Sequence, residues 1–258
     1  MRTRLLLSFL VAALAVPVAS FAQYEGERGL LGEFVTWRVA PEAATDFEAA
    51  IIKVVEAAKL ANLAEEHAWF MWQDGFDYAL YGPTNNFAEF DDPEAWMRAF
   101  QGTPGEAMLM EAMEAFGSLD YQVLSREVIE QVPGWDYQVE EPYDVKYAHM
   151  YESWMKPGTE MQADEISREW VAMLTELGYP YEAAGFRVHF GDVGRLVYIT
   201  WYDDQADYYG PKAQATLVEA KGGGEKWQDL GNRWNALITR YEESTWAFRA
   251  DMSYGQSM

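Results

Sequence analysis

Residues 147–158 read YAHMYESWMKPG, an alternating stretch that ends in a lysine-proline-glycine turn. Alternation with a period of two predicts a half-buried strand over Tyr147–Met155. Beyond the turn the period changes, and apolar residues recur at steps of 0, 4, 7, 8 and 11, as on one face of a helix. These residues are Ile166, Trp170, Met173, Leu174 and Leu177. The stretch therefore predicts a strand that passes through a tight turn into a long helix.

The same strand-and-helix pattern occurs earlier in the chain. Residues 34–39 alternate, and the same helical steps recur at Phe47, Ile51, Val54, Val55 and Ala58. The rest of the first half has strand patterns at 68–73 and 77–81 with an extension toward 90, a helical region at 93–116 broken at 102–105, and a strand near 121–128. The second half has strands around 184–190 and 195–202, a helical region broken at 222–224, and a final strand at 245–252. Each half is predicted to have the order βαββαβ.

Matched residues indicate that the two halves are copies of one unit. Pro41 and Pro157, Phe70 and Phe186, Gly75 and Gly191, and Leu80 and Leu196 are each 116 residues apart (157 − 41 = 116). A fixed period of this kind is the pattern of an internal repeat. Residues 131–144, with Pro133-Gly134 and Pro142, are predicted to be the linker. The predicted domains are residues 1–22, a first repeat over 23–137 and a second repeat over 138–258.

Composition limits the partners of the chain. Its 258 residues are 50% hydrophobic, so it can bury a large core. With 19 Lys and Arg against 42 Asp and Glu, the net charge is -23, which argues against nucleic acid as a partner. The chain has no cysteine, which excludes disulfides and thiolate metal sites.

The first residues are predicted to be a secretory signal peptide. Arg2 and Arg4 form a basic start, residues 5–16 are apolar apart from Ser8, and residues 20–22 are a cleavage pattern. The apolar run is too short to span a membrane, and no cysteine follows it for lipid attachment. The expected product is an exported soluble protein, periplasmic or extracellular, with no membrane anchor after cleavage.

The unit resembles a known superfamily. The turn at residues 155–158 and the strand Val197-Tyr198-Ile199-Thr200-Trp201-Tyr202-Asp203 are similar to those of ferredoxin-like dimeric α/β-barrel proteins, above all the NIPSNAP-like and antibiotic-biosynthesis-monooxygenase-like groups. The resemblance implies an α+β fold in which two four-stranded antiparallel sheets close into a barrel with helices outside. It further implies that two tandem ferredoxin-like units form this α/β barrel within one molecule.

Strand faces give the first candidates for a site. Phe186, Val188 and Phe190 share one face of a predicted strand, and Arg187 and His189 share the other. We expect the apolar face to meet the helices and Arg187 and His189 to point into the barrel.

Further residues would complete a polar patch in an aromatic-lined cavity, the usual make-up of a small-molecule site. The predicted ligand-binding residues are His149, Tyr151, Arg187, His189, Trp201, Trp246 and Arg249. In the alternative interpretation, Arg187 pairs with a nearby carboxylate and the histidines are structural hydrogen-bonding groups. No residue is singled out as catalytic.

Cofactors and metals have little support in the sequence. Three histidines without metal-ligand spacing do not indicate a metal site, and no cofactor is predicted. The superfamily includes haem proteins, so the resemblance implies haem as an alternative, through His149 or His189. The acidic pairs at 91–92 and 203–204 are predicted to cap helices, with Asp92 as the N-cap before Pro93.

Three functions remain open on the sequence alone. The leading hypothesis is an exported soluble barrel that binds a small apolar or aromatic molecule in its interior. The second is a cofactor-independent monooxygenase-like enzyme on an aromatic substrate, with His189, Arg187 and Tyr151 as polarising or proton-transfer groups. The third is a structural or interaction protein with a filled barrel. The sequence does not decide whether the protein is an enzyme, or whether it is a monomer or a homodimer.

Overall fold

The computed structural model describes residues 29–84, 86–92, 94–138 and 145–255. The predicted signal peptide and residues 139–144 of the predicted linker lie outside the described residues. Among the described residues, no helix is long and apolar enough to cross a membrane.

Each half of the chain contributes four strands with helices between them. The first half contains β1 (Leu31–Val39), α1 (Ala44–Ala61), β2 (Phe70–Asp74), β3 (Asp77–Thr84), α2 (Ala95–Arg98), α3 (Glu106–Phe116) and β4 (Tyr121–Gln131). The second contains β5 (Tyr147–Met155), α4 (Glu160–Leu177), β6 (Ala183–Phe190), β7 (Arg195–Tyr202), α5 (Gln205–Tyr208), α6 (Gln214–Ala220), α7 (Gly224–Leu237) and β8 (Ile238–Phe248). The offset from β1 to β5 (147 − 31) and from α1 to α4 (160 − 44) is 116 residues, as the repeat predicts.

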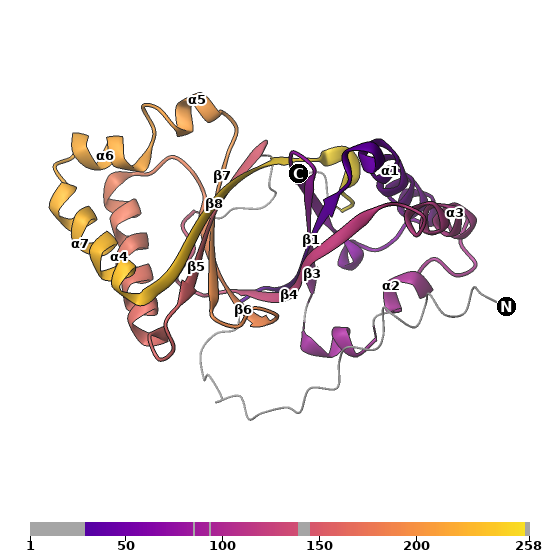
Figure 1. The fold of residues 1–258 in the computed structure, drawn as a ribbon, viewed down its shortest axis with the longest axis horizontal. Helices are drawn as coiled ribbons and strands as arrows, with labels where there is room; N and C mark the ends of the chain where they lie inside the picture. Colours follow the sequence, from indigo (N-terminus) through magenta and orange to yellow (C-terminus); the bar gives the residue numbers. More distant parts are fainter. Residues whose placement is uncertain (1–28, 85, 93, 139–144, 256–258) are drawn as a thin grey trace.

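The eight strands form one closed antiparallel barrel in the order β1-β3-β2-β8-β5-β7-β6-β4. Each repeat supplies four adjacent strands, and the two sheets join where β2 pairs with β8 and β4 pairs with β6. Figure 1 shows α1 and α3 outside the barrel on one side and α4, α6 and α7 outside it on the other. The predicted α+β fold, with both ferredoxin-like units in one barrel, is confirmed.

Three details of the prediction are wrong. The last strand begins at Ile238, not Thr245, because Ile238 and the polar residues 240–243 pair with β5. Leu80 does not correspond to Leu196, because the offset from β3 to β7 is 118 (202 − 84) and the turn before β7 is longer. Asp92 is not an N-cap: its carboxylate pairs with Arg98, and α2 begins at Ala95.

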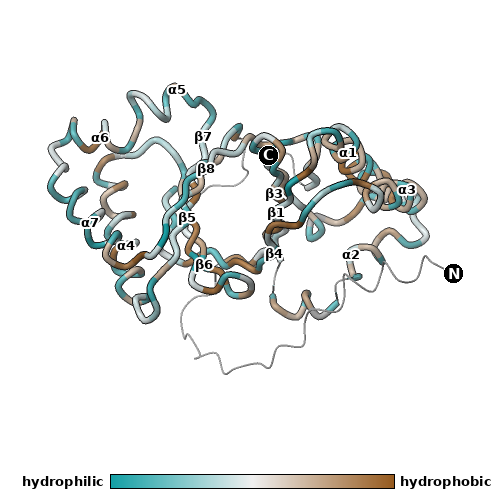
Figure 2. The backbone as a smooth tube through the Cα atoms, viewed as in Figure 1, coloured by the Kyte–Doolittle hydropathy of each residue, from teal (hydrophilic) through white to brown (hydrophobic). Residues whose placement is uncertain are grey.

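Apolar side chains from all eight strands pack in the barrel interior as a single cluster. It contains Phe34, Trp72, Ala79, Ile129, Ala148, Met150, Ala184, Phe186, Val188, Val197, Trp201 and Trp246. Figure 2 shows hydrophobic positions along β4, β5 and β6, which border this interior. The expected orientation of β6 is therefore wrong, since Phe186 and Val188 point into the barrel. A barrel strand meets apolar surroundings on both faces, so its own pattern does not say which face is inside.

The opposite faces of the second repeat's strands meet its helices. Leu196 of β7 packs in a second buried cluster with Ile166 and Met173 of α4 and Leu230 of α7. Trp170, which the helical steps place on the buried face, packs at the edge of this cluster together with Trp227 and Trp234. The helix layer is thus a separate core, and polar residues on the outer strand faces lie between sheet and helices.

Candidate functional site

The structure separates most of the predicted site residues. Trp201 and Trp246 lie in the barrel interior. Arg187 lies over the ring of Trp135, 5.8 Å from its centroid, and Trp135 belongs to the helix-side core. His189 and Arg249 lie elsewhere again, as their contacts with carboxylates show. These residues do not form one patch.

The contacts of His189 and Arg249 are charged. His189 Nε2 is 2.5 Å from Glu130 Oε2. The Arg249 guanidinium donates to Gln73 Oε1 at 2.6 Å and to Glu48 Oε2 at 3.0 Å. Gln73 and Glu48 belong to the first repeat, so Arg249 binds the C-terminal end of the chain to that repeat.

His149 and Tyr151 do come together, on the outer face of β5 rather than inside the barrel. Their ring centroids are 4.4 Å apart. Tyr208 and Tyr209, at the end of α5, lie against them. We call this region the tyrosine compartment, and it consists of His149, Tyr151, Tyr179, Tyr181, Tyr202, Tyr208, Tyr209 and Thr245.

Helix α5 positions the two tyrosines that cover the compartment. Asp204 accepts hydrogen bonds from the backbone N–H groups of Ala206 at 2.8 Å and Asp207 at 3.1 Å, which confirms the predicted cap at this acidic pair. The single helical turn that follows brings the Tyr208 ring flat onto Tyr202, with centroids 4.0 Å apart and an interplanar angle of 2°.

Hydroxyl groups make the polar contacts in the compartment. The Tyr209 hydroxyl is 2.7 Å from His149 Nδ1 and 2.6 Å from Thr245 Oγ1, and Thr245 Oγ1 is itself 3.0 Å from His149 Nδ1. The Tyr151 and Tyr208 hydroxyls are 3.0 Å apart. Two phenols from α5 therefore contact polar groups of β5 and β8.

Burial keeps these groups neutral. His149 is only 4% exposed, and burial lowers the pKa of its imidazole even though the carboxylate of Glu243 favours the charged form. Glu243 Oε2 lies 3.4 Å from His149 Nε2, which favours the tautomer with its proton on Nε2 and leaves Nδ1 as an acceptor. Burial also raises the pKa of Tyr151 to about 12. The compartment thus combines a neutral imidazole acceptor with neutral phenols.

Several buried polar atoms of the compartment lack a hydrogen-bond partner among the described residues. They are the hydroxyls of Tyr179, Tyr181 and Tyr202. The Tyr202 hydroxyl lies near Tyr209 and Thr245 but outside hydrogen-bonding geometry. Buried polar groups in proteins are normally satisfied, so this concentration indicates a place for polar atoms other than those of the chain, in water or in a ligand.

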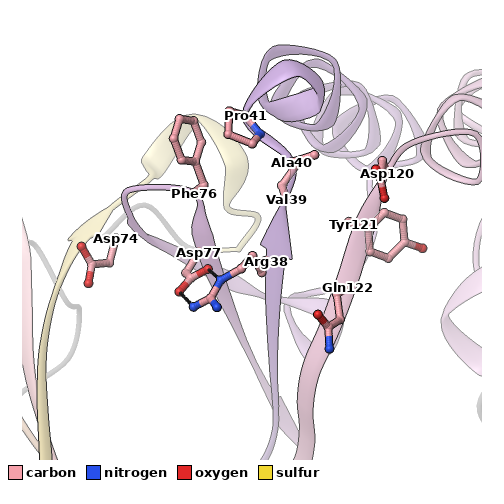
Figure 3. Close-up of a pocket in the computed structure, with 10 residues that line it drawn as sticks. All are labelled: Arg38, Val39, Ala40, Pro41, Asp74, Phe76, Asp77, Asp120, Tyr121 and Gln122. Atoms are coloured by element: carbon pink, nitrogen blue, oxygen red, sulfur yellow. Dashed lines mark hydrogen bonds and ion pairs between the residues drawn. The ribbon is translucent and has the colours of Figure 1, made fainter.

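A surface depression of about 500 Å³ lies elsewhere, in the first repeat. Figure 3 shows Arg38 and Asp77 on its wall, joined by two hydrogen bonds of 2.8 and 2.7 Å, with Phe76 and Tyr121 nearby. None of the predicted site residues lines it. Its acidic residues spread over an open surface rather than converging.

Sequence reasoning missed a charged group inside the barrel. Arg195 is 8% exposed and pairs with both Glu127 of β4 and Glu152 of β5. Each of the three lies two residues from a member of the interior cluster on its own strand, so all three share the inner face. The three residues are far apart in sequence, and only the barrel register brings them together.

Neither metal nor haem fits the described side chains. Among them, no three His, Cys, Asp or Glu residues are grouped as a metal site. The His149 ring is enclosed by Tyr151, Tyr208 and Tyr209, with Nδ1 hydrogen bonded and Nε2 beside Glu243. His189 Nε2 is held by Glu130. As placed, neither imidazole presents Nε2 to an open face where a macrocycle could lie.

Solved structures share the fold of the chain. A candidate monooxygenase of Fusobacterium nucleatum has 11% identity and a TM-score of 0.56, over 90% of this chain and 100% of the other. An anthrone oxidase-like protein has 11% identity and a TM-score of 0.56, over 90% and 98%. A mutant chlorite dismutase of Candidatus Nitrospira defluvii has 12% identity and a TM-score of 0.51, over 88% and 93%.

The chain has the dimeric α/β-barrel fold. No protein-family model matches the sequence, and no curated protein matches it. In this α/β barrel, the tyrosine compartment belongs to the second repeat alone. The position equivalent to His149 is Glu33 (149 − 116), which forms an ion pair with Arg126.

Proposed function

We propose that the protein binds a small aromatic molecule with a polar substituent in the tyrosine compartment. The observation that carries this proposal is the group of buried, unpartnered hydroxyls on Tyr179, Tyr181 and Tyr202, beside the imidazole of His149. They lie among tyrosine rings, and aromatic walls with a few polar groups are what a small aromatic ligand requires. The neutral imidazole of His149 accepts a hydrogen bond at Nδ1, which favours a ligand that donates one.

The barrel interior is the less favourable place for such a ligand. Its centre is occupied by a cluster of twelve buried apolar side chains, five of them large aromatic residues. A ligand there would have to displace packed side chains. A ligand buried in the tyrosine compartment would instead form hydrogen bonds with polar groups that are otherwise unpaired.

The experiment is a binding titration with 4-nitrophenol, a small aromatic molecule with one hydroxyl. We expect saturable binding to the wild type and at least tenfold weaker binding to His149→Phe. The matched control is His67→Phe, because His67 lies in the first repeat beside Glu66 and outside the compartment. Equal affinity in all three proteins, or no binding to any, would overturn the proposal.

We keep a cofactor-independent monooxygenase-like activity as the second candidate. The observation that favours it is the neutral His149, whose Nδ1 can accept a proton from an activated aromatic substrate. An anthrone oxidase-like protein is among the proteins of the same fold. Anthrone is therefore the substrate to test. His149 would take a proton from C10, and the carbanion would react with O2 to give anthraquinone and one water per O2 consumed.

Oxygen uptake with anthrone tests this activity. We expect one anthraquinone formed per O2 consumed, and a rate that falls toward the uncatalysed rate in His149→Phe but not in His67→Phe. A wild-type rate no higher than that of buffer alone would reject oxygenation and leave the binding proposal standing.

A further inference from the structure

Tyr209 combines an exposed side chain with a firmly held hydroxyl. It is 56% exposed, among the most exposed large aromatic residues described. Its hydroxyl nevertheless contacts His149 Nδ1 at 2.7 Å and Thr245 Oγ1 at 2.6 Å. A surface tyrosine normally has its hydroxyl in water, whereas this one inserts its hydroxyl into a buried polar pair.

Apart from Tyr209 itself, the segment that carries Tyr209 is held to the compartment mainly by Tyr208, which stacks on Tyr202. In α5 only Tyr208 is buried, and Gln205 and Ala206 are exposed. Asp204 caps the first turn, and Lys212 pairs with Asp207 within the same segment. In the view of Figure 1, α5 stands apart from α4, α6 and α7 at the rim of the second repeat. Its contacts with the compartment are made chiefly through the rings and hydroxyls of Tyr208 and Tyr209.

The hydroxyls of Tyr208 and Tyr209 show which chemical group the polar atoms of β5 and β8 in the compartment bind. His149 and Thr245 bind a phenol from Tyr209, and Tyr151 binds a phenol from Tyr208. Because His149 is neutral with an acceptor at Nδ1, a phenolic O–H satisfies it, whereas an aromatic ether cannot donate to it.

We propose that Tyr209 is an internal stand-in for the ligand, so that the ligand is a phenol whose hydroxyl replaces that of Tyr209 on His149 and Thr245. This inference rests on the proposed function of the compartment. The segment of α5 is then a lid, and it opens when the ligand takes the place of Tyr209. The measured affinity is reduced by the fraction of molecules in which Tyr209 occupies the site.

The test compares affinities for 4-nitrophenol and for 4-nitroanisole, which has the same ring but no hydroxyl. Tyr209→Ala removes the stand-in and should bind 4-nitrophenol about tenfold more tightly than the wild type. Tyr209→Phe loses only the hydroxyl contacts and should also bind more tightly. The affinity for 4-nitroanisole should change by less than twofold in Tyr209→Phe. Tyr254→Phe is the matched control, because the Tyr254 hydroxyl donates to Leu63 O in the first repeat, at 2.7 Å.

The outcomes separate this inference from the function on which it rests. If the wild type binds 4-nitrophenol through His149 but neither Tyr209 variant binds more tightly, the stand-in is rejected and the binding site remains. If the two probes gain equally in both variants, recognition of the phenol is rejected. If no protein binds 4-nitrophenol, both proposals fail. Because Tyr209 is largely exposed, its variants should fold, and circular dichroism checks this.

Discussion

Replacing Arg195 by Met should destabilise the barrel strongly, because it leaves two carboxylates buried without their cation. Glu127 is 3% exposed, and the Glu152 side chain is 15% exposed. Breaking a buried ion pair by removing one partner costs about 3–5 kcal/mol. The same change at Arg38, an exposed residue paired with Asp77, should cost about 1 kcal/mol or less. Arg38→Met is therefore the matched control.

The pKa values of the two buried carboxylates determine how the destabilisation by Arg195→Met changes with pH. Burial raises the pKa of both Glu127 and Glu152 in the folded state, while Arg195 opposes the rise. The negative charge of Asp192 adds to the rise in the pKa of Glu127, and that of Glu242 adds to the rise in the pKa of Glu152, which the positive charge of Arg240 opposes. A raised folded pKa favours the fold below the ordinary carboxyl pKa, and this stabilisation is lost as pH rises through the folded pKa. Without Arg195 the folded pKa values rise further, so the loss at pH 7 is larger.

Urea unfolding at pH 7 and at pH 4.5 measures the effect. We expect the free energy of unfolding of Arg195→Met to be about 3–5 kcal/mol below that of the wild type at pH 7, and this gap to be smaller at pH 4.5. A gap below about 1 kcal/mol at pH 7 would refute the reasoning, since it is the value for an exposed pair. A gap that widens at pH 4.5 would also refute it.

Three further predictions concern the lid, the barrel and the N-terminus. Asp204→Ala removes the cap of α5 and destabilises this helical turn by about 1 kcal/mol. Because the lid then opens more easily, 4-nitrophenol should bind about fivefold more tightly in a titration. Unchanged or weaker binding would count against the lid. Trp246→Ala should cost about 3–5 kcal/mol in urea unfolding but leave 4-nitrophenol affinity within about twofold. Lost binding in a folded Trp246→Ala would place the ligand in the barrel instead. Mass spectrometry of protein exported from cells should find Gln23 as the first residue, and a retained Met1 would exclude cleavage.

Much of the fold could be predicted from periodicity. The alternation over Tyr147–Met155 gave the bounds of β5, and the helical steps from Ile166 to Leu177 fell within α4. The start of β8 could not be found in this way, because residues 239–243 are polar and exposed and gain their strand conformation from pairing with β5. Tertiary pairing overrides a local pattern in such an edge segment.

The site was less predictable than the fold. His149 and Tyr151 were found because alternation places both on one face of β5. Arg187 was misplaced, since the barrel interior and the helix layer are both apolar and a strand pattern cannot distinguish them. Tyr208 and Tyr209 do have a local signal, because the two adjacent tyrosines end an Asp-capped helical turn.

A structure of the protein with bound 4-nitrophenol tests the central claim most directly. The account predicts the ligand in the tyrosine compartment, with its hydroxyl oxygen within hydrogen-bonding distance of His149 Nδ1 and Thr245 Oγ1 and with Tyr209 displaced. A ligand inside the barrel, or in the depression beside Arg38 and Asp77, with Tyr209 still on His149, would contradict it.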